Sequence, residues 1–176
     1  MMQLKMHHPN LADLASTPPL PEGYCLRPYE EQDMPSLIHT LNVAFPGMNW
    51  TEETVRKSLL DDPTVLETYV VVHEDNVVAT ASSQQIPNPP NMDCYLHWVA
   101  TDPQHQGKKL GMVVSYGAVE HFKRLGAKEA FLMTDDFRTS AITIYLRMGF
   151  RPCLVDETHP QRWEAIFTSS GVVRPD

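Results

Sequence analysis

A polar turn between an apolar segment and a helical pattern carries the clearest chemical signal in this sequence. Residues 99–111 read V-A-T-D-P-Q-H-Q-G-K-K-L-G, in which Pro103 ends the preceding strand and Gly107 permits a tight backbone. Amides in the first turn of a helix lack intrahelical acceptors and lie at the positive end of the helix dipole, so they bind phosphate without arginine. Such a turn is equally typical of an ordinary connection between a strand and a helix, so a second signal has to decide.

The turn differs from the two common nucleotide-binding loops. It has neither the G-x-x-x-x-G-K-[ST] spacing of a P-loop nor the G-x-G-x-x-G spacing of a dinucleotide-binding fold. A second segment, residues 138–150, reads R-T-S-A-I-T-I-Y-L-R-M-G-F and predicts a helix that ends at Gly149. Neither segment alone indicates a class of function, but the two together do.

Together the two segments resemble the GNAT superfamily of N-acetyltransferases. The acetyl-CoA site of that family is built from an apolar-x-V-x-P-x-x-[QR]-G-x-G-x-[GA] segment and an A-x-x-x-Y-x-x-x-G-F segment. The residues that match are Val99, Pro103, Gln106, Gly107 and Gly111 in the first, and Ala141, Tyr145, Gly149 and Phe150 in the second. The expected order of strands and helices over residues 23–168 also agrees with the family.

Three positions depart from the family pattern. Thr101 stands where valine is usual, Arg138 stands where many members carry asparagine, and Lys109 replaces the middle glycine of the turn. A residue with a β-carbon fits there if the backbone keeps a negative φ, as in the first turn of a helix. In that case Lys108 and Lys109 add two charges near the diphosphate or the 3′-phosphate; otherwise the affinity for the cofactor suffers.

The resemblance implies acetyl-CoA as co-substrate, with no metal. In the family the splayed fourth and fifth strands hold the pantetheine arm, and a backbone amide polarises the thioester carbonyl; here that donor is the amide of Val99 or its neighbour. The residues expected to bind the cofactor are Val99, Ala100, Thr101, Gln106, Gly107, Lys108, Lys109, Leu110, Gly111, Arg138, Ala141 and Tyr145.

Two side chains are candidate catalytic groups. Tyr145 would be the general acid, since collapse of the tetrahedral intermediate expels a thiolate whose conjugate acid has a pKa of ~8.5; the alternative is a core aromatic on the stripe with Ala141 and Met148. His97 would accept the amine proton, because strand alternation places it on the side of Tyr95 and Val99. Water as the base, or a histidine hydrogen-bonded within the sheet, are the alternatives to this role.

Other polar and aromatic residues give weaker indications. His7 and His8 have no third ligand nearby, so we expect no metal site there. The family builds its acceptor pocket between the first two helices and the last hairpin. The residues that fall there are Trp50, Asp156, Glu157, His159 and Trp163, although the acids would equally suit a solvated loop.

The pattern of elements predicts an α/β (α+β) fold. We expect a mixed, mostly antiparallel central sheet of about six or seven strands, with helices on both faces and a right-handed crossover between the fourth and fifth strands. The expected strands are 23–29, 68–73, 77–83, 93–101, 130–134, 150–155 and 162–168, and the expected helices are 33–45, 51–60, 110–125 and 139–148. Asp75 and Asn76 should turn the first hairpin, and residues 87–91 should form a loop.

Composition bounds the organisation and the partners. The 176 residues suit one domain, with residues 1–21 as a flexible, proline-rich arm and residues 22–176 as the GNAT-like domain. A net charge of −8 argues against general attraction to nucleic acid or anionic lipid. Three scattered cysteines and the absence of a long apolar run predict a reducing, cytoplasmic location without a membrane span.

These observations predict an acetyl-CoA-dependent N-acetyltransferase, an acyltransferase of EC class 2.3.1. It would transfer an acetyl group to a primary amine of a small molecule by direct attack in a ternary complex. The alternatives are a non-catalytic acyl-CoA-binding sensor or regulatory module, and a protein or peptide N-acetyltransferase. Edge strands in this family often pair, so a homodimer is compatible with the resemblance.

Overall fold

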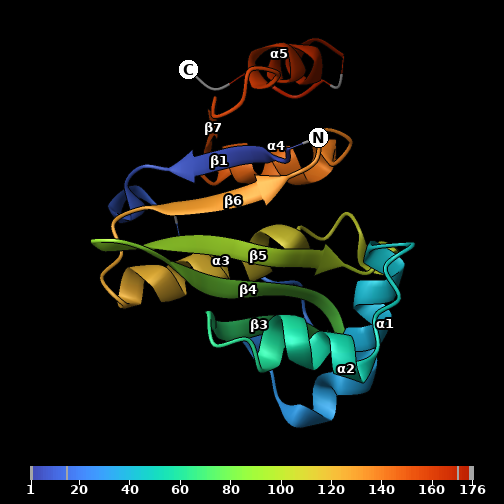
Figure 1. Cartoon of the computed structure of the whole chain (residues 1–176). Helices are drawn as coiled ribbons and strands as arrows, with labels where there is room; N and C mark the ends of the chain where they lie inside the picture. Colours follow the sequence, from blue (N-terminus) through green and yellow to red (C-terminus); the bar gives the residue numbers. More distant parts are fainter. Residues whose placement is uncertain (1, 15, 170, 175–176) are drawn as a thin grey trace.

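The computed structural model describes residues 2–14, 16–169 and 171–174. Its centre is a seven-stranded mixed sheet with the strand order β2-β3-β4-β5-β6-β1-β7 (Figure 1). The strands are β1 (Leu4–His8), β2 (Tyr24–Pro28), β3 (Val65–His73), β4 (Asn76–Asn88), β5 (Asn91–Thr101), β6 (Ala130–Thr134) and β7 (Arg151–Cys153). The helices are α1 (Met34–Ala44), α2 (Glu52–Val55), α3 (Leu110–Arg124), α4 (Thr139–Arg147) and α5 (His159–Ser169), with a π-turn over Arg56–Leu60 after α2 and 3-10 turns at Leu11–Asp13, Glu31–Asp33 and Pro103–His105.

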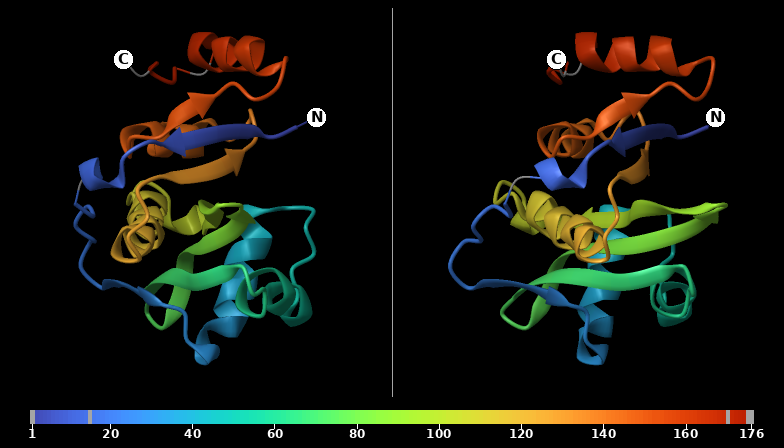
Figure 2. Two further views of the ribbon diagram at one scale, coloured as in Figure 1. Left: turned by 60° about the vertical axis from the view of Figure 1, so that its left-hand side comes forward. Right: turned by 90° about the vertical axis from the view of Figure 1, so that its left-hand side faces the viewer.

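Helices cover both faces of the sheet, as the sequence predicts. Figure 2 shows α3 and the α1–α2 segment on opposite sides of the strands. The stripe Leu110, Val113, Val114, Ala118 and Phe122 of α3 is buried against one face, because apolar residues recur there at helical spacing. Leu37 and Leu41 of α1 pack against the other face together with Val55 of α2.

The parallel pair β5–β6 separates soon after it forms. Pairing joins Tyr95 to Phe131 and Leu96 to Leu132, and beyond these residues the two strands diverge (Figure 1). A β-bulge follows in β5, where Trp98 and Val99 stand opposite Ala81 of β4, and Trp98 has a φ of 46°. A bulge bends its strand and disrupts the local ladder, which opens the sheet at this point.

The beginning of the chain differs from the expected flexible arm. Leu4–His8 form β1, which lies between β6 and β7 and pairs antiparallel with both. Leu4, Met6 and His8 alternate with less buried neighbours, which is the strand period of two. The prolines that suggested an extended lead-in stand at positions 18, 19 and 21, after this strand, and so impose nothing on it.

The prediction of a strand over residues 162–168 is wrong, because this segment belongs to α5. Trp163 and Ile166 are buried three residues apart, and the rings of Trp163 and Phe167 stack four residues apart, which is helical spacing. A short apolar run fits a strand or a helix from its periodicity alone.

Smaller differences concern the two hairpins. Glu74 and Asp75, rather than Asp75 and Asn76, have positive φ at the first turn. The loop expected at 87–91 is shorter, since β4 extends to Asn88 and β5 begins at Asn91. In the part of the chain that the structure describes, no helix combines the length and the apolar character that crossing a bilayer requires.

Candidate functional site

The turn before α3 leaves a run of backbone donors free. Within the described residues, the N–H groups of Gly107, Lys108, Lys109, Leu110 and Gly111 have no hydrogen-bond acceptor. They lie at the N-terminal end of α3, where the helix dipole is positive. The turn borders a pocket of about 400 Å³, which we call the cradle; it is lined chiefly by the end of β5, this turn and the first half of α4. Free amides beside a hollow are the donor set that a diphosphate requires.

Lys109 does not have the negative φ that would have suited its β-carbon. Its φ is 60° and its ψ is 21°, in the left-handed region that glycine normally occupies. The backbone of the turn therefore keeps the shape of the glycine pattern while carrying a lysine. Lys109 lines the cradle, whereas Lys108 is exposed outside its lining in the described structure.

Two glycines of the motifs are required by close neighbours. A Cβ on Gly111 would lie 3.1 Å from Thr101 Oγ1, so the small residue lets α3 begin against the end of β5. A Cβ on Gly149, whose φ is 101°, would lie 2.7 Å from Nε2 of His8. His8 is buried, and its Nε2 donates to the carbonyl of Met148 at 3.0 Å, so β1 fixes the turn that ends α4.

A second and larger pocket occupies the gap between β5 and β6. This splay pocket has a volume of about 580 Å³ and shares Phe45, Val99 and Arg138 with the cradle, so the two adjoin. Its remaining lining residues are Gln3, Gln84, Ile86, Tyr95, Leu96, His97, Trp98, Met133, Thr134, Asp135 and Tyr145. The free amides therefore border a pocket that adjoins the one lined by both candidate catalytic side chains.

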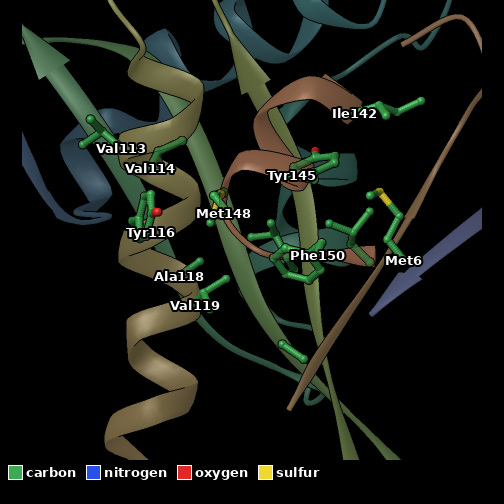
Figure 3. Packing of buried hydrophobic residues seen from close by; sticks show 14 of the residues in the cluster. Met6, Val113, Val114, Tyr116, Ala118, Val119, Ile142, Tyr145, Met148 and Phe150 are labelled. Atoms are coloured by element: carbon green, nitrogen blue, oxygen red, sulfur yellow. The ribbon is translucent and has the colours of Figure 1, made fainter. Parts of the chain in front are cut away.

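Tyr145 reaches the splay pocket from α4 (Figure 3). Its ring packs edge-on against Phe150 with a centroid distance of 6.2 Å, and 6% of the residue is exposed. Burial raises the pKa of Tyr145 well above its usual value, and the charge of Arg138 opposes the shift. The phenol is therefore protonated at neutral pH and available as a donor.

His97 also lines the splay pocket, but its environment weakens it as a base. Burial lowers the pKa of His97 to about 4, although Asp62 acts in the opposite direction. The imidazole is thus neutral near pH 7 and can accept a hydrogen bond, while its protonated form is a strong acid.

The bulge also overturns the predicted side for His97. His97 pairs with Ser82, whose hydroxyl bonds to Thr68, whereas the neighbouring Ser83 bonds to the carbonyl of Ala118 on the α3 face. Val99 packs against the cluster on the α3 face, while Trp98 and Ala100 join the α1–α2 cluster. One extra residue shifts the alternation, so His97 and Val99 face opposite sides of the sheet.

Arg138 lies where the two pockets meet. Its guanidinium donates to Asp135 at 3.1 Å and lies 4.7 Å from the ring centre of Phe45. Asp135 also accepts from Gln3 at 3.2 Å. The cation thus ties the start of α4 to the end of α1, and Arg138 lines both pockets.

The residues expected around the acceptor lie elsewhere. Trp50 packs edge-on against Trp98 at 4.7 Å in the α1–α2 core, and Trp163 is buried in α5. The stretch with Asp156, Glu157 and His159 leads into α5 and lines neither the splay pocket nor the cradle in the described structure. His7 bonds to Glu129, and no group of three candidate metal ligands forms among the described residues.

Sequence reasoning missed several polar and apolar residues that line the splay pocket. Gln84 stands directly across from Tyr95 on the neighbouring strand, and Met133 and Asp135 lie at the carboxyl end of β6. Strand alternation could have placed Gln84 on the face of His97 once the register was known. Gln3 gave no signal, because its segment was not expected in the sheet.

Comparison with known proteins decides the family. The description of the matching family profile is "Acetyltransferase (GNAT) family", and the match covers residues 34–150. This chain belongs to that family. Membership confirms the resemblance of the two motifs to a family whose members use acetyl-CoA. The predicted fold class is confirmed as well.

Relatives of this GNAT chain are distant. A mycothiol acetyltransferase of Nocardia farcinica is 26% identical over 172 residues, covering 88% of this chain and 53% of the relative. The chain spans about half the length of the curated relatives it matches.

Two of the solved structures that share the fold illustrate the likeness. A GCN5-related N-acetyltransferase from Kribbella flavida has a TM-score of 0.61 and 18% identity, covering 86% of this chain and 55% of that one. An aminoglycoside acetyltransferase from an uncultured soil metagenomic sample, solved with trehalose, has a TM-score of 0.60 and 19% identity, covering 72% and 87%.

Proposed function

We propose that this chain transfers the acetyl group of acetyl-CoA to a primary amine of a small molecule, by direct attack in a ternary complex. The observation that carries the proposal is that two pockets adjoin at Phe45, Val99 and Arg138. One is bordered by the free amides at residues 107–111, and the other is lined by Tyr145 and His97. Family membership supports the acyl donor. The named relatives act on chemically different acceptors, so they do not select one for this chain.

The cradle supplies the binding contribution. Amides of Gly107, Lys109 and Gly111 would bind the diphosphate, and the ammonium group of Lys109 adds a positive charge at the same turn. Thr101 and Ala141 line the floor along which the pantetheine arm would run. Bound acetyl-CoA supplies an activated thioester carbonyl.

The bulge and Tyr145 supply the contribution to chemistry. An N–H group freed from the ladder at Trp98 or Val99 would donate to the thioester oxygen as negative charge develops there. The protonated phenol of Tyr145 would donate to the departing sulfur. Arg138 would keep the region where the two pockets adjoin positive, beside the phosphate groups.

Proton removal from the amine is the demanding step. An alkyl ammonium has a pKa of ~10, whereas the pKa of His97 is about 4, so direct transfer to His97 is strongly uphill. We therefore assign His97 the role of hydrogen-bond acceptor that orients a neutral amine, with water carrying the proton away. The reaction should accelerate as pH rises and more of the amine is neutral.

Calorimetric titration with acetyl-CoA, followed by thiol release with phenethylamine, glycinamide, spermidine and kanamycin, tests the proposal. We expect binding and amine-dependent release. Failure to bind acetyl-CoA would refute the function. Binding with no release in the presence of these amines or of peptides would favour the acyl-CoA-binding sensor instead.

A further inference from the structure

A chain of three polar side chains leads from the loop after α2 to the splay pocket. Asp62 Oδ1 accepts from the backbone N–H of Thr64 at 2.8 Å and from its hydroxyl at 2.6 Å. The Nε2 of Gln84 in turn donates to Thr64 Oγ1 at 2.9 Å. Thr64 is also anchored through its backbone carbonyl, which accepts from the N–H of Gln85 at 2.7 Å.

The direction of these bonds is fixed by chemistry. The hydrogen bonds from Thr64 lower the pKa of Asp62, so its carboxylate has no proton to donate at neutral pH. The single hydroxyl proton of Thr64 is therefore committed to Asp62, and Thr64 Oγ1 can only accept from Gln84. The NH2 group is the only part of the Gln84 side chain that can donate, so the amide cannot flip without losing this bond.

In the described structure, the consequence is a side-chain carbonyl oxygen without a donor on a residue that lines the pocket. Gln84 lines the splay pocket, and among the described residues no donor contacts its Oε1. Gln84 stands across from Tyr95 and lies on the same face of the sheet as His97. The carbonyl is thus placed on the acceptor side, away from the face that carries Val99.

Charge in the pocket makes this carbonyl important. Asp135 is the one carboxylate lining the described splay pocket, and it is already engaged by Arg138 at 3.1 Å and Gln3 at 3.2 Å. An amine that enters must find neutral acceptors. Gln84 Oε1 and the neutral imidazole of His97 are two such groups on one face.

We propose that Gln84 is a specificity-determining residue whose side-chain carbonyl accepts a hydrogen bond from the acceptor's amine, with Thr64 and Asp62 as positioning residues that hold the amide in this orientation. The proposal rests on the proposed acetyl transfer. According to the proposal, the loop after α2 and strand β4 together form the part of the splay pocket that recognises the amine. The orienting partner, Thr64, lies outside the lining of the splay pocket.

Four variants separate recognition from folding. Gln84→Met removes the carbonyl at similar length, and Thr64→Val removes the hydroxyl at similar volume. Thr64→Ser keeps the hydroxyl and is the matched control for Thr64→Val. Gln85→Met is the positional control, because Gln85 donates to Cys94 Sγ and does not line the described splay pocket.

The assay measures KM and kcat for the amine of the panel above that the wild type acetylates fastest, together with the Kd for acetyl-CoA and the Tm. An unpaired donor costs roughly tenfold, so Gln84→Met should lower kcat/KM for the amine by about tenfold through KM. Thr64→Val should lower it by roughly fivefold, while Thr64→Ser and Gln85→Met stay within about twofold. The Kd for acetyl-CoA should not change in any of them.

Two results would overturn the proposal while leaving acetyl transfer intact: an amine KM unchanged in Gln84→Met, or equal losses in Thr64→Val and Thr64→Ser. A wild type that binds no acetyl-CoA, or releases no thiol with any of the amines, would instead refute the proposed function together with this inference. Failure of this inference would be seen in the Gln84 and Thr64 variants, whereas failure of the proposed function would be seen in the wild type.

Discussion

The cradle and the splay pocket are built on different principles, although they adjoin. The cradle depends on backbone: free amides at residues 107–111, a left-handed turn at Lys109, and Gly111 placed 3.1 Å from Thr101. The splay pocket depends on side chains whose pKa values burial has shifted, above all Tyr145 and His97. We therefore expect the binding of acetyl-CoA to tolerate side-chain substitutions that the acetyl-transfer step does not tolerate.

Substitution of Tyr145 should separate the contributions of the two pockets most clearly. We expect Tyr145→Phe to lower kcat by about 10²- to 10⁴-fold, the usual contribution of a general acid, with the Kd for acetyl-CoA unchanged. Thiol-release kinetics and calorimetry measure the two quantities. Tyr116→Phe is the matched control, because Tyr116 is equally buried but lines neither pocket in the described structure. A parallel loss of kcat in both variants would show that Tyr145 acts through packing.

The backbone requirement at the end of the second motif is tested by comparing two glycines with positive φ, Gly149 and Gly126. Gly149→Ala should lower the free energy of unfolding by about 2 to 3 kcal/mol, because the new Cβ meets the buried His8 as well as backbone strain. Gly126→Ala has a similar φ with no neighbour within 4 Å and should cost only about 1 kcal/mol. Equal losses in denaturant unfolding would mean that His8 moves aside without cost.

The low pKa of His97 makes stability depend on pH. The unfolded chain binds a proton at this residue near pH 6.5 and the folded protein near pH 4, so stability falls as pH drops through this window. Between pH 7 and pH 5, His97→Gln should lose less stability than the wild type, by on the order of 1 to 2 kcal/mol. Denaturant unfolding at the two pH values measures this, and identical losses would place the histidine in a more polar environment.

The smallest effect is expected at Lys109, where backbone and charge can be separated. Lys109→Gly removes the strain of a φ of 60° and should raise the free energy of unfolding by up to about 1 kcal/mol. Lys109→Ala keeps the strain and should leave stability nearly unchanged. Both remove the charge, so both should weaken acetyl-CoA binding at low salt. A less stable glycine variant would contradict the account of this turn.

The features that could be predicted from the sequence are those that depend on local backbone, and the features that could not are those that depend on packing between distant side chains. The turn at residues 107–111, the bounds of α3 and the end of α4 could be predicted because glycine and proline mark local backbone turns whatever the rest of the chain does. The strand that lies between β6 and β7 could not be predicted. Leu4–His8 and residues 162–168 both have the apolar spacing of a possible strand, and tertiary packing decides which of the two segments joins the sheet.

The acceptor side was hidden for a related reason. The bulge at Trp98 requires a positive φ at a residue other than glycine, so no local pattern marks it, yet it reverses the side on which Val99 lies relative to His97. The contact of Gln84 with Thr64 depends on the register of β3 and β4, which periodicity does not set.

The central claim is that the free amides before α3 bind acetyl-CoA so that its thioester lies beside Tyr145. A titration of ¹⁵N-labelled protein with acetyl-CoA, followed by amide chemical shifts, tests it most directly. We predict the largest shifts at residues 107–111 and at Val99, saturating together. Saturable binding that leaves these amides unmoved would contradict the account.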